Sequence, residues 1–187
     1  MTFLSKLILS GTILFLFNQC TIYDKNFDNP VDFRANKEKG ILSPTLVFYP
    51  KTQTISLTDS IVVGAFIVFE NDSLEPFTSA HIQMKFPKDL IQLDTILPGL
   101  FITDTNQSTP LFVYSFDSLN TINIFTYFLD TNKVNILGTG HLADIVFNPL
   151  VIGSDSIYYN LNECSMFDEF DDDININGTR AAEIIIQ

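Results

Sequence analysis

The sequence predicts an all-β domain, a sandwich of about nine antiparallel strands. Stretches of alternating apolar and polar residues recur along the chain, and a period of two is typical of a strand with one buried face. Turn residues separate these stretches at the spacing expected of a β-sandwich. Phe, Ile and Val are abundant, with 18 Phe among 187 residues, and no stretch has a convincing helical period.

Residues 1–19 resemble a bacterial export signal. Lys6 supplies the positive end, and residues 7–17 form an apolar run too short to span a bilayer comfortably. The segment ends at Cys20, a pattern similar to that of lipoproteins, in which this cysteine is lipidated after cleavage. Leu16 supplies the aliphatic residue that the lipoprotein pattern has at this distance before the cysteine. Residues 17–19 are larger than the small residues usual in that pattern. We expect export and lipidation at Cys20; an uncleaved anchor and a cleaved soluble signal are the alternatives.

The chain after Cys20 divides into a tether and a domain. Residues 20–42 mix charges with Asn and have no periodicity, so we expect a flexible tether with little fixed structure. The domain is expected to span residues 43–187. Together these segments predict a protein of the bacterial cell envelope, an outer-membrane or surface lipoprotein whose only membrane contact is the N-terminal lipid.

The most regular alternation, in residues 80–86, organises the predicted domain. Ala80, Ile82, Met84 and Phe86 fall on one side and His81, Gln83 and Lys85 on the other, and Pro87 ends the ladder. Residues 61–69 are almost continuously apolar, which favours a central strand. Residues 111–116 and 121–129 flank a polar spacer and predict a hairpin. Further strands are expected at residues 45–49, 53–57, 90–93, 141–147, 156–159 and 182–186.

The order of these features resembles the cohesin family over roughly residues 44–187. The segment HIQMKFPKDL at residues 81–90 is similar to the family's alternating strand and the chain corner that follows it. The family's corner has Asp followed by Pro, and this order is absent here. GHLADIVF at residues 140–147 resembles the family's small-residue strand, and GSDSI at residues 153–157 its next element. Asn177 and Gly178 resemble the start of the family's last element, although the final strand lies further along the chain from Gly178 than it does in the family.

This resemblance implies a nine-stranded jelly roll and a non-catalytic module that docks a dockerin-like exported protein in polysaccharide handling. A carbohydrate-binding module of the same architecture is the alternative, which the absence of Trp mildly disfavours. Docking is expected on strands 78–86 and 111–129, and the candidate partner-binding residues are His81, Gln83, Lys85, Tyr114, Phe116 and Tyr127. The predicted hairpin is crowded with aromatic residues, Tyr114, Phe116, Phe125, Tyr127 and Phe128. Core packing is expected to account for most of them, and those that face outward would form a flat apolar patch suited to a partner protein or to sugar rings.

An acidic segment near the C-terminus contains a partial calcium pattern. Asp171, Asp173, Asn175 and Asn177 could offer alternating oxygens before the turn residue Gly178, but Ile184 stands where a bidentate acid is needed. We therefore expect a solvated acidic loop and no cofactor, with calcium as the alternative.

The sequence gives little support for a reactive cysteine, a zinc site, an enzyme active site or a nucleic-acid-binding surface. Nothing beside Cys164 would lower its pKa, and the nearby acids would raise it. We expect His81 on the polar side of its strand and His141 on the side of Ala143 and Ile145; neither has zinc-ligand spacing. No acid pair, triad or phosphate loop is present, which argues against an enzyme. A net charge of −12 disfavours nucleic acid and anionic membrane surfaces.

Overall fold

The computed structural model describes residues 28–70, 77–100, 111–117, 119–127 and 139–187, and the account below concerns these residues. They form twelve strands and two short helices, α2 (Phe33–Glu38) and the 3-10 helix η1 (Leu161–Glu163). The strands are β1 (Thr45–Tyr49), β2 (Thr52–Ile55), β3 (Ile61–Val68), β4 (Ser79–Lys85), β5 (Ile91–Pro98), β6 (Leu111–Phe116), β7 (Thr121–Tyr127), β8 (Gly140–Pro149), β9 (Gly153–Tyr159), β10 (Ser165–Phe167), β11 (Gly178–Arg180) and β12 (Ala182–Ile186).

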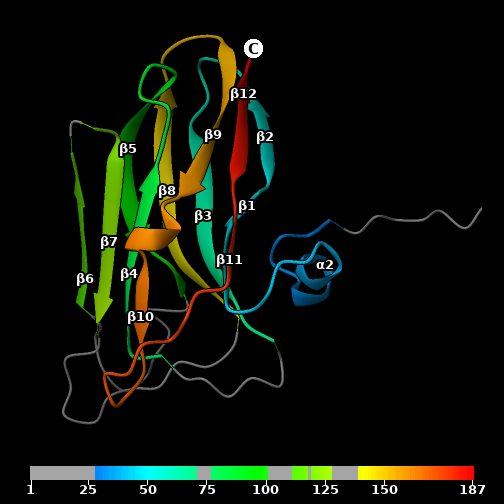
Figure 1. Cartoon of the computed structure of the whole chain (residues 1–187). Helices are drawn as coiled ribbons and strands as arrows, with labels where there is room; N and C mark the ends of the chain where they lie inside the picture. Colours follow the sequence, from blue (N-terminus) through cyan, green and yellow to red (C-terminus); the bar gives the residue numbers. More distant parts are fainter. Residues whose placement is uncertain (1–27, 71–76, 101–110, 118, 128–138) are drawn as a thin grey trace, which may run out of the picture.

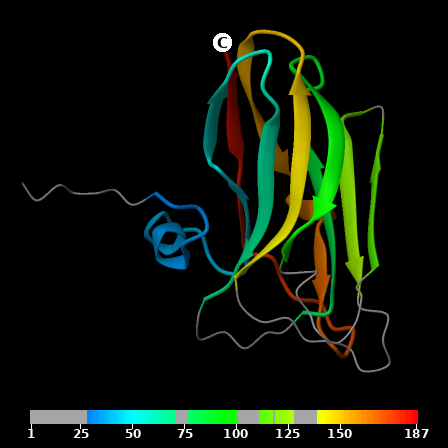
Figure 2. The same ribbon diagram turned by 180° about the vertical axis from the view of Figure 1, so that it is seen from behind.

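Two β-sheets pack face to face and confirm the predicted all-β sandwich (Figure 1, Figure 2). The five-stranded sheet has the order β11-β1-β3-β8-β5. The seven-stranded sheet has the order β2-β12-β9-β4-β7-β6, and β10 pairs with β4 beside this path. The predicted hairpin is confirmed, because β6 and β7 pair antiparallel throughout.

The prediction of a purely antiparallel sandwich is wrong for two strand pairs. β1 runs parallel to β11, and β2 runs parallel to β12. A parallel pair needs a long connection, and these pairs join the beginning of the domain to its end, so almost the whole sandwich forms that connection. The short strands β10 and β11 were not predicted, and with them the described residues form twelve strands where about nine were expected.

The core lies between the sheets and follows the predicted alternation of β4. Ala80, Ile82, Met84 and Phe86 are all buried in it. The opposite sheet contributes Phe48, whose ring stacks on that of Tyr159 with centroids 4.0 Å apart. The Tyr159 hydroxyl donates a 3.0 Å hydrogen bond to the Val47 carbonyl, so its polar end is satisfied inside the core.

His141 does not share a face with Ala143, contrary to the alternation in the sequence. The register of β8 against β3 shifts after the pair Ala65–Ala143, so that the next residue, Phe66, lies opposite His141. This irregularity lets Leu142 and Ala143 both be buried and turns His141 to the outer face. There its ring stacks on Phe66 with centroids 4.5 Å apart.

Residues 28–42 contain fixed structure, so the expectation of a flexible tether is wrong for this part. The Asp32 side chain caps α2 by accepting hydrogen bonds from the backbone N–H groups of Arg34 and Ala35. Arg180 of β11 donates to Asn36 of α2 at 3.0 Å and to the Asp28 carboxylate at 2.6 Å. The segment is therefore attached to the edge of the five-stranded sheet (Figure 1).

The predicted signal at residues 1–19, the lipidation site Cys20 and residues 21–27 of the tether lie outside the described residues, as does Phe128. Among the described residues, no helix combines the length and apolar character needed to cross a membrane.

Candidate docking surface

Three neighbouring strands of the seven-stranded sheet, β4, β7 and β6, present one continuous outer face. His81 of β4 lies opposite Phe125 of β7, which lies opposite Val113 of β6. Since directly opposed residues point to the same side of a sheet, the members of this face follow from the register. The β4–β7–β6 face consists of Ser79, His81, Gln83, Lys85, Leu111, Val113, Ser115, Thr121, Asn123, Phe125 and Tyr127.

The middle of the β4–β7–β6 face is apolar and aromatic. The His81 and Phe125 rings stack in parallel, with centroids 4.3 Å apart. Phe125 leaves 43% of its surface exposed, and Val113 and Leu111 beside it are similarly open. Exposed apolar side chains that adjoin one another across three strands form a patch of the kind that marks a protein-binding surface.

A hollow of about 500 Å³ deepens this patch where β10 joins β4. Ser165 and Phe167 of β10 lie opposite His81 and Ser79, so both sides of the hollow stand on one sheet. Its lining is Ser79, Ala80, His81, Phe125, Thr126, Tyr127, Ser165, Phe167 and Asp171. The hollow is lined mainly by rings and hydroxyl groups and could receive an apolar side chain of a partner.

A chain of side-chain hydrogen bonds crosses the same face. The Asn160 amide N–H donates to Gln83 Oε1 at 2.6 Å, and the Gln83 amide N–H donates to Asn123 Oδ1 at 3.0 Å. His81 Nε2 lies 3.0 Å from the same Asn123 oxygen, which can only accept, so Nε2 carries the proton. This relay of Asn160, Gln83, Asn123 and His81 fixes the polar half of the face next to its aromatic half.

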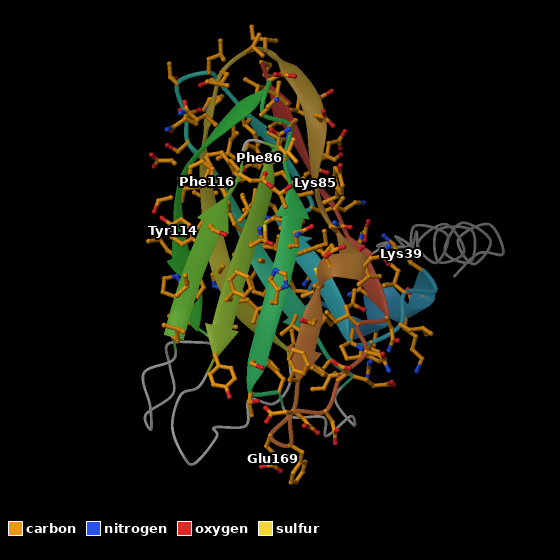
Figure 3. The ribbon with its side chains drawn as sticks, turned by 60° about the vertical axis from the view of Figure 1, so that its left-hand side comes forward. Lys39, Lys85, Phe86, Tyr114, Phe116 and Glu169 are labelled. Carbon is orange, nitrogen blue, oxygen red and sulfur yellow. The ribbon has the colours of Figure 1, made fainter. Side chains whose placement is uncertain are left out.

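The structure brings together four of the six predicted partner-binding residues. His81, Gln83, Lys85 and Tyr127 all lie on the β4–β7–β6 face, with Lys85 toward one end of β4 (Figure 3).

Tyr114 and Phe116 lie on the other side of β6, opposite Ile124 and Ile122 of β7. Because Ile122 and Ile124 point into the core, these two aromatic residues cannot share the face of His81, and their placement in one surface is a correction. They are nevertheless exposed, at 39% and 64%, because β6 is the last strand of its sheet (Figure 3).

Several residues of the face were missed as site residues. Phe125 was noted only as one of several crowded aromatic residues, and the alternation in residues 121–127 could have assigned it to the outer side. Asn123 reaches the site through the pairing of β4 with β7, Asn160 through the pairing of β4 with β9, and Phe167 through the pairing of β4 with β10, so no local pattern identifies them.

Two of the calcium candidates have other contacts in the structure. Asn177 uses its amide N–H to donate to the Ser43 carbonyl at 2.6 Å, and Asp173 bridges to Phe167 in the backbone. Asp171 adopts a positive φ of 66° in the acidic loop, at the hollow. Within the described ranges, no group of three or more His, Cys, Asp or Glu side chains is placed to hold a metal ion.

Cys164 is half-buried behind the relay, with its sulfur 3.3 Å from the Gln83 backbone nitrogen and 3.4 Å from the Asn160 carbonyl oxygen. Burial raises the pKa of the Cys164 thiol, and the Glu163 carboxylate adds to this rise. The predicted direction of the shift is confirmed, although burial contributes more than the acid; the expectation that nothing beside Cys164 lowers its pKa is wrong, because the hydrogen bond with the Gln83 backbone lowers it. A thiol held protonated in this way is a poor nucleophile, and it acts here as a packing group.

No protein-family model matches this sequence, and a search of curated proteins finds no match. Solved structures do match. The cohesin CaCohA2 of Clostridium acetobutylicum, in complex with a dockerin, superimposes with a TM-score of 0.63 at 18% identity. The superposition covers 76% of this chain and 99% of that one.

Two further structures agree. A type I cohesin–dockerin complex from Clostridium thermocellum matches at a TM-score of 0.60 and 14% identity, covering 76% of this chain and 92% of the other. A type II cohesin from the cellulosome of Acetivibrio cellulolyticus matches at 0.58 and 17%, covering 75% and 92%. At such identities a likeness shows the fold alone. The chain therefore has the cohesin fold, a β-sandwich of the jelly-roll type.

Proposed function

We propose that this protein is a non-catalytic docking module that binds an exported partner of the dockerin type through the β4–β7–β6 face. One observation carries the proposal: this fold presents a continuous outer face in which stacked rings adjoin a fixed polar relay. Structures of similar fold were solved as cohesin–dockerin complexes, which supports the same class of partner here.

The architecture of the face suits protein docking. Its exposed apolar centre offers area to bury, and the hollow beside Phe167 can receive an anchoring side chain. The relay supplies hydrogen-bonding groups whose directions are already set, and Lys85 adds a positive charge at one end. A largely uncharged centre also limits the desolvation cost of binding.

We further propose that the module is exported and held in the cell envelope by a lipid on Cys20, where it would serve polysaccharide handling. The apolar run before Cys20 supports export, and the fold supports the role. Metabolic labelling with a fatty-acid analogue checks the anchor: label in the wild type and none in Cys20→Ser is expected, and an unlabelled wild type would reject it.

The docking proposal is tested by searching the exported proteins of the same organism for dockerin-type domains and titrating the purified chain with every one that is found. Phe125→Asp should weaken binding by about 30-fold or more, the range of a central aromatic residue in an interface. Val62→Asp is a matched control, because Val62 is also 43% exposed but lies on the opposite sheet. Thermal unfolding of both variants checks that they fold.

The possible outcomes distinguish a wrong binding face from a wrong function. Tight binding that Phe125→Asp leaves unchanged would reject the β4–β7–β6 face as the site. If none of the dockerin-type domains binds, the function itself is rejected. Saturable binding of a polysaccharide in a parallel glycan titration would instead favour the carbohydrate-binding alternative.

A further inference from the structure

Among the residues that the structure describes, the edge strand β6 lacks the protection that the other sheet edges have. Exposed edges of β-sheets carry unpaired backbone N–H and C=O groups, and proteins guard them with charges, bulges, short strands or a covering segment. In the described part of the chain, β6 is hydrogen-bonded to β7 alone and forms the end of the seven-stranded sheet (Figure 1, Figure 2). Its sequence, LFVYSF, has no charge and no Pro.

The other edges of the two sheets are each guarded. β5 contains Asp94 at a register irregularity and ends in Pro98. β2 has only four residues, and Lys51 precedes it. β11 has three residues, and its Arg180 is bonded to the segment that contains α2. The contrast with these three edges indicates that the β6 edge is a contact surface.

We propose that two copies of this chain associate through their β6 strands. The two β6 strands pair antiparallel about a twofold axis and join the two seven-stranded sheets. A twofold axis perpendicular to the sheet keeps each residue on its own face, and it lies between the two strands, midway between the two copies of one β6 residue. An axis between the two Tyr114 residues places them opposite each other and Phe112 opposite Phe116. All the aromatic residues of β6 then pair across the new contact, which is a favourable cross-strand arrangement.

A second copy fits this edge despite the net charge of −12. Among the described residues, the acid next to β6 in the sequence is Asp117, whose carboxylate accepts hydrogen bonds from the backbone of Leu119 and Thr121 within its own turn. In the proposed register Asp117 lies opposite Leu111, so the two Asp117 residues are six positions, about 20 Å, apart. That distance exceeds the screening length of about 8 Å at physiological salt, and the acids do not oppose the contact.

The contact is independent of the docking proposal. Tyr114 and Phe116 point to the side of the sheet away from the β4–β7–β6 face, so a substitution there leaves the docking residues in place. They are also the two predicted partner-binding residues that the structure separates from the rest. Their exposure is explained if a second copy of β6 covers them.

Sedimentation analysis of the full chain over a concentration series tests the proposal. A monomer–dimer equilibrium is expected, and Tyr114→Lys should weaken it by at least about tenfold, because it places two like charges opposite each other. Tyr49→Lys, at an exposed aromatic residue of the other sheet, is the control and should leave it unchanged. A chain that stays monomeric at every concentration overturns the proposal, as does a dimer that Tyr114→Lys leaves intact.

A cross-linking experiment tests the register. Tyr114→Cys in a background that carries Cys20→Ser and Cys164→Ser should give a disulfide-linked dimer under mild oxidation, since opposed residues have Cα atoms about 4.5–5.5 Å apart, within disulfide reach. Tyr49→Cys in the same background should stay monomeric. Absence of the Tyr114→Cys cross-link would reject the pairing. Loss of partner binding in Tyr114→Lys, with no dimer in the wild type, would assign the edge to the partner and reject self-association.

Discussion

Asp28 holds the N-terminal segment to the end of the domain, and its replacement by Asn should measurably weaken the fold. Its carboxylate forms ion pairs with Lys39, Lys51 and Arg180. Arg180 is only 8% exposed, so its guanidinium depends on Asp28 and on the buried Asn36 for partners. Asp28→Asn removes the negative charge from this cluster but keeps the size of the side chain.

The expected loss can be estimated contact by contact. The bond to Arg180 is charge-assisted and mostly sheltered, so its loss costs about 2 kcal/mol. Lys39 and Lys51 are largely exposed, and each pair adds at most a few tenths of a kcal/mol. Since Asp28 is itself 26% exposed and the Asn oxygen can still accept one bond, we expect a net loss of about 1.5–2.5 kcal/mol. That corresponds to a fall in Tm of about 3–10 °C for a domain of this size.

The effect should also depend on pH in one direction. Lys39, then Lys51 and Arg180, hold the pKa of Asp28 well below its ordinary value of 3.8. A carboxyl group whose pKa is lower in the folded state stabilises the fold above its unfolded pKa and loses this contribution as pH falls toward the folded pKa. The stability difference between wild type and Asp28→Asn should therefore be full at pH 7 and shrink below about pH 4.

Urea unfolding at pH 7 and at pH 3, followed by circular dichroism, measures both effects. Asp94→Asn is the control, because it makes the same charge change at an exposed position on β5. If Asp28→Asn is no less stable than this control at pH 7, the cluster does not hold the segment. A difference that grows at low pH would contradict the assigned pKa shift.

Two further predictions concern buried groups. Tyr159→Phe should lower the free energy of unfolding by about 1 kcal/mol, because the Val47 carbonyl loses its 3.0 Å donor while the ring stack on Phe48 remains; unchanged stability in urea would show that this bond contributes nothing. Cys164 should react with iodoacetamide at pH 8 more slowly in the folded protein than in urea, because burial raises its pKa. Mass spectrometry measures both rates, and equal rates would contradict the assigned protonation.

The fold was predictable because most strands have one wet and one buried face. The alternation in residues 80–86 and the spacer between β6 and β7 each carry their own local signal. Three elements have none. α2 is six residues long, too short for a helical stripe, and β10 and β11 have three residues each, so their strand form depends on pairing with β4 and β1.

The candidate site was predictable only in part, for a related reason. On β4 the contrast between apolar and polar residues assigns His81, Gln83 and Lys85 to the outer side. On β6 nearly every residue is apolar, so the sequence cannot say which side Tyr114 and Phe116 take, and only the register with β7 decides. At His141 a single shift in register reverses the side that alternation predicts.

The relay through Gln83 has a consequence for how a partner would be recognised. Asn160 donates to the Gln83 oxygen, and Gln83 donates onward to Asn123, so rotating the Gln83 amide alone by half a turn would place donor against donor and acceptor against acceptor. The donors and acceptors of the relay can therefore reverse only together, with the three amides rotated and the proton of His81 moved to its other ring nitrogen. A partner that matches the arrangement seen in the structure gives up little side-chain freedom on binding, whereas one that mismatches it must reverse the whole relay at once.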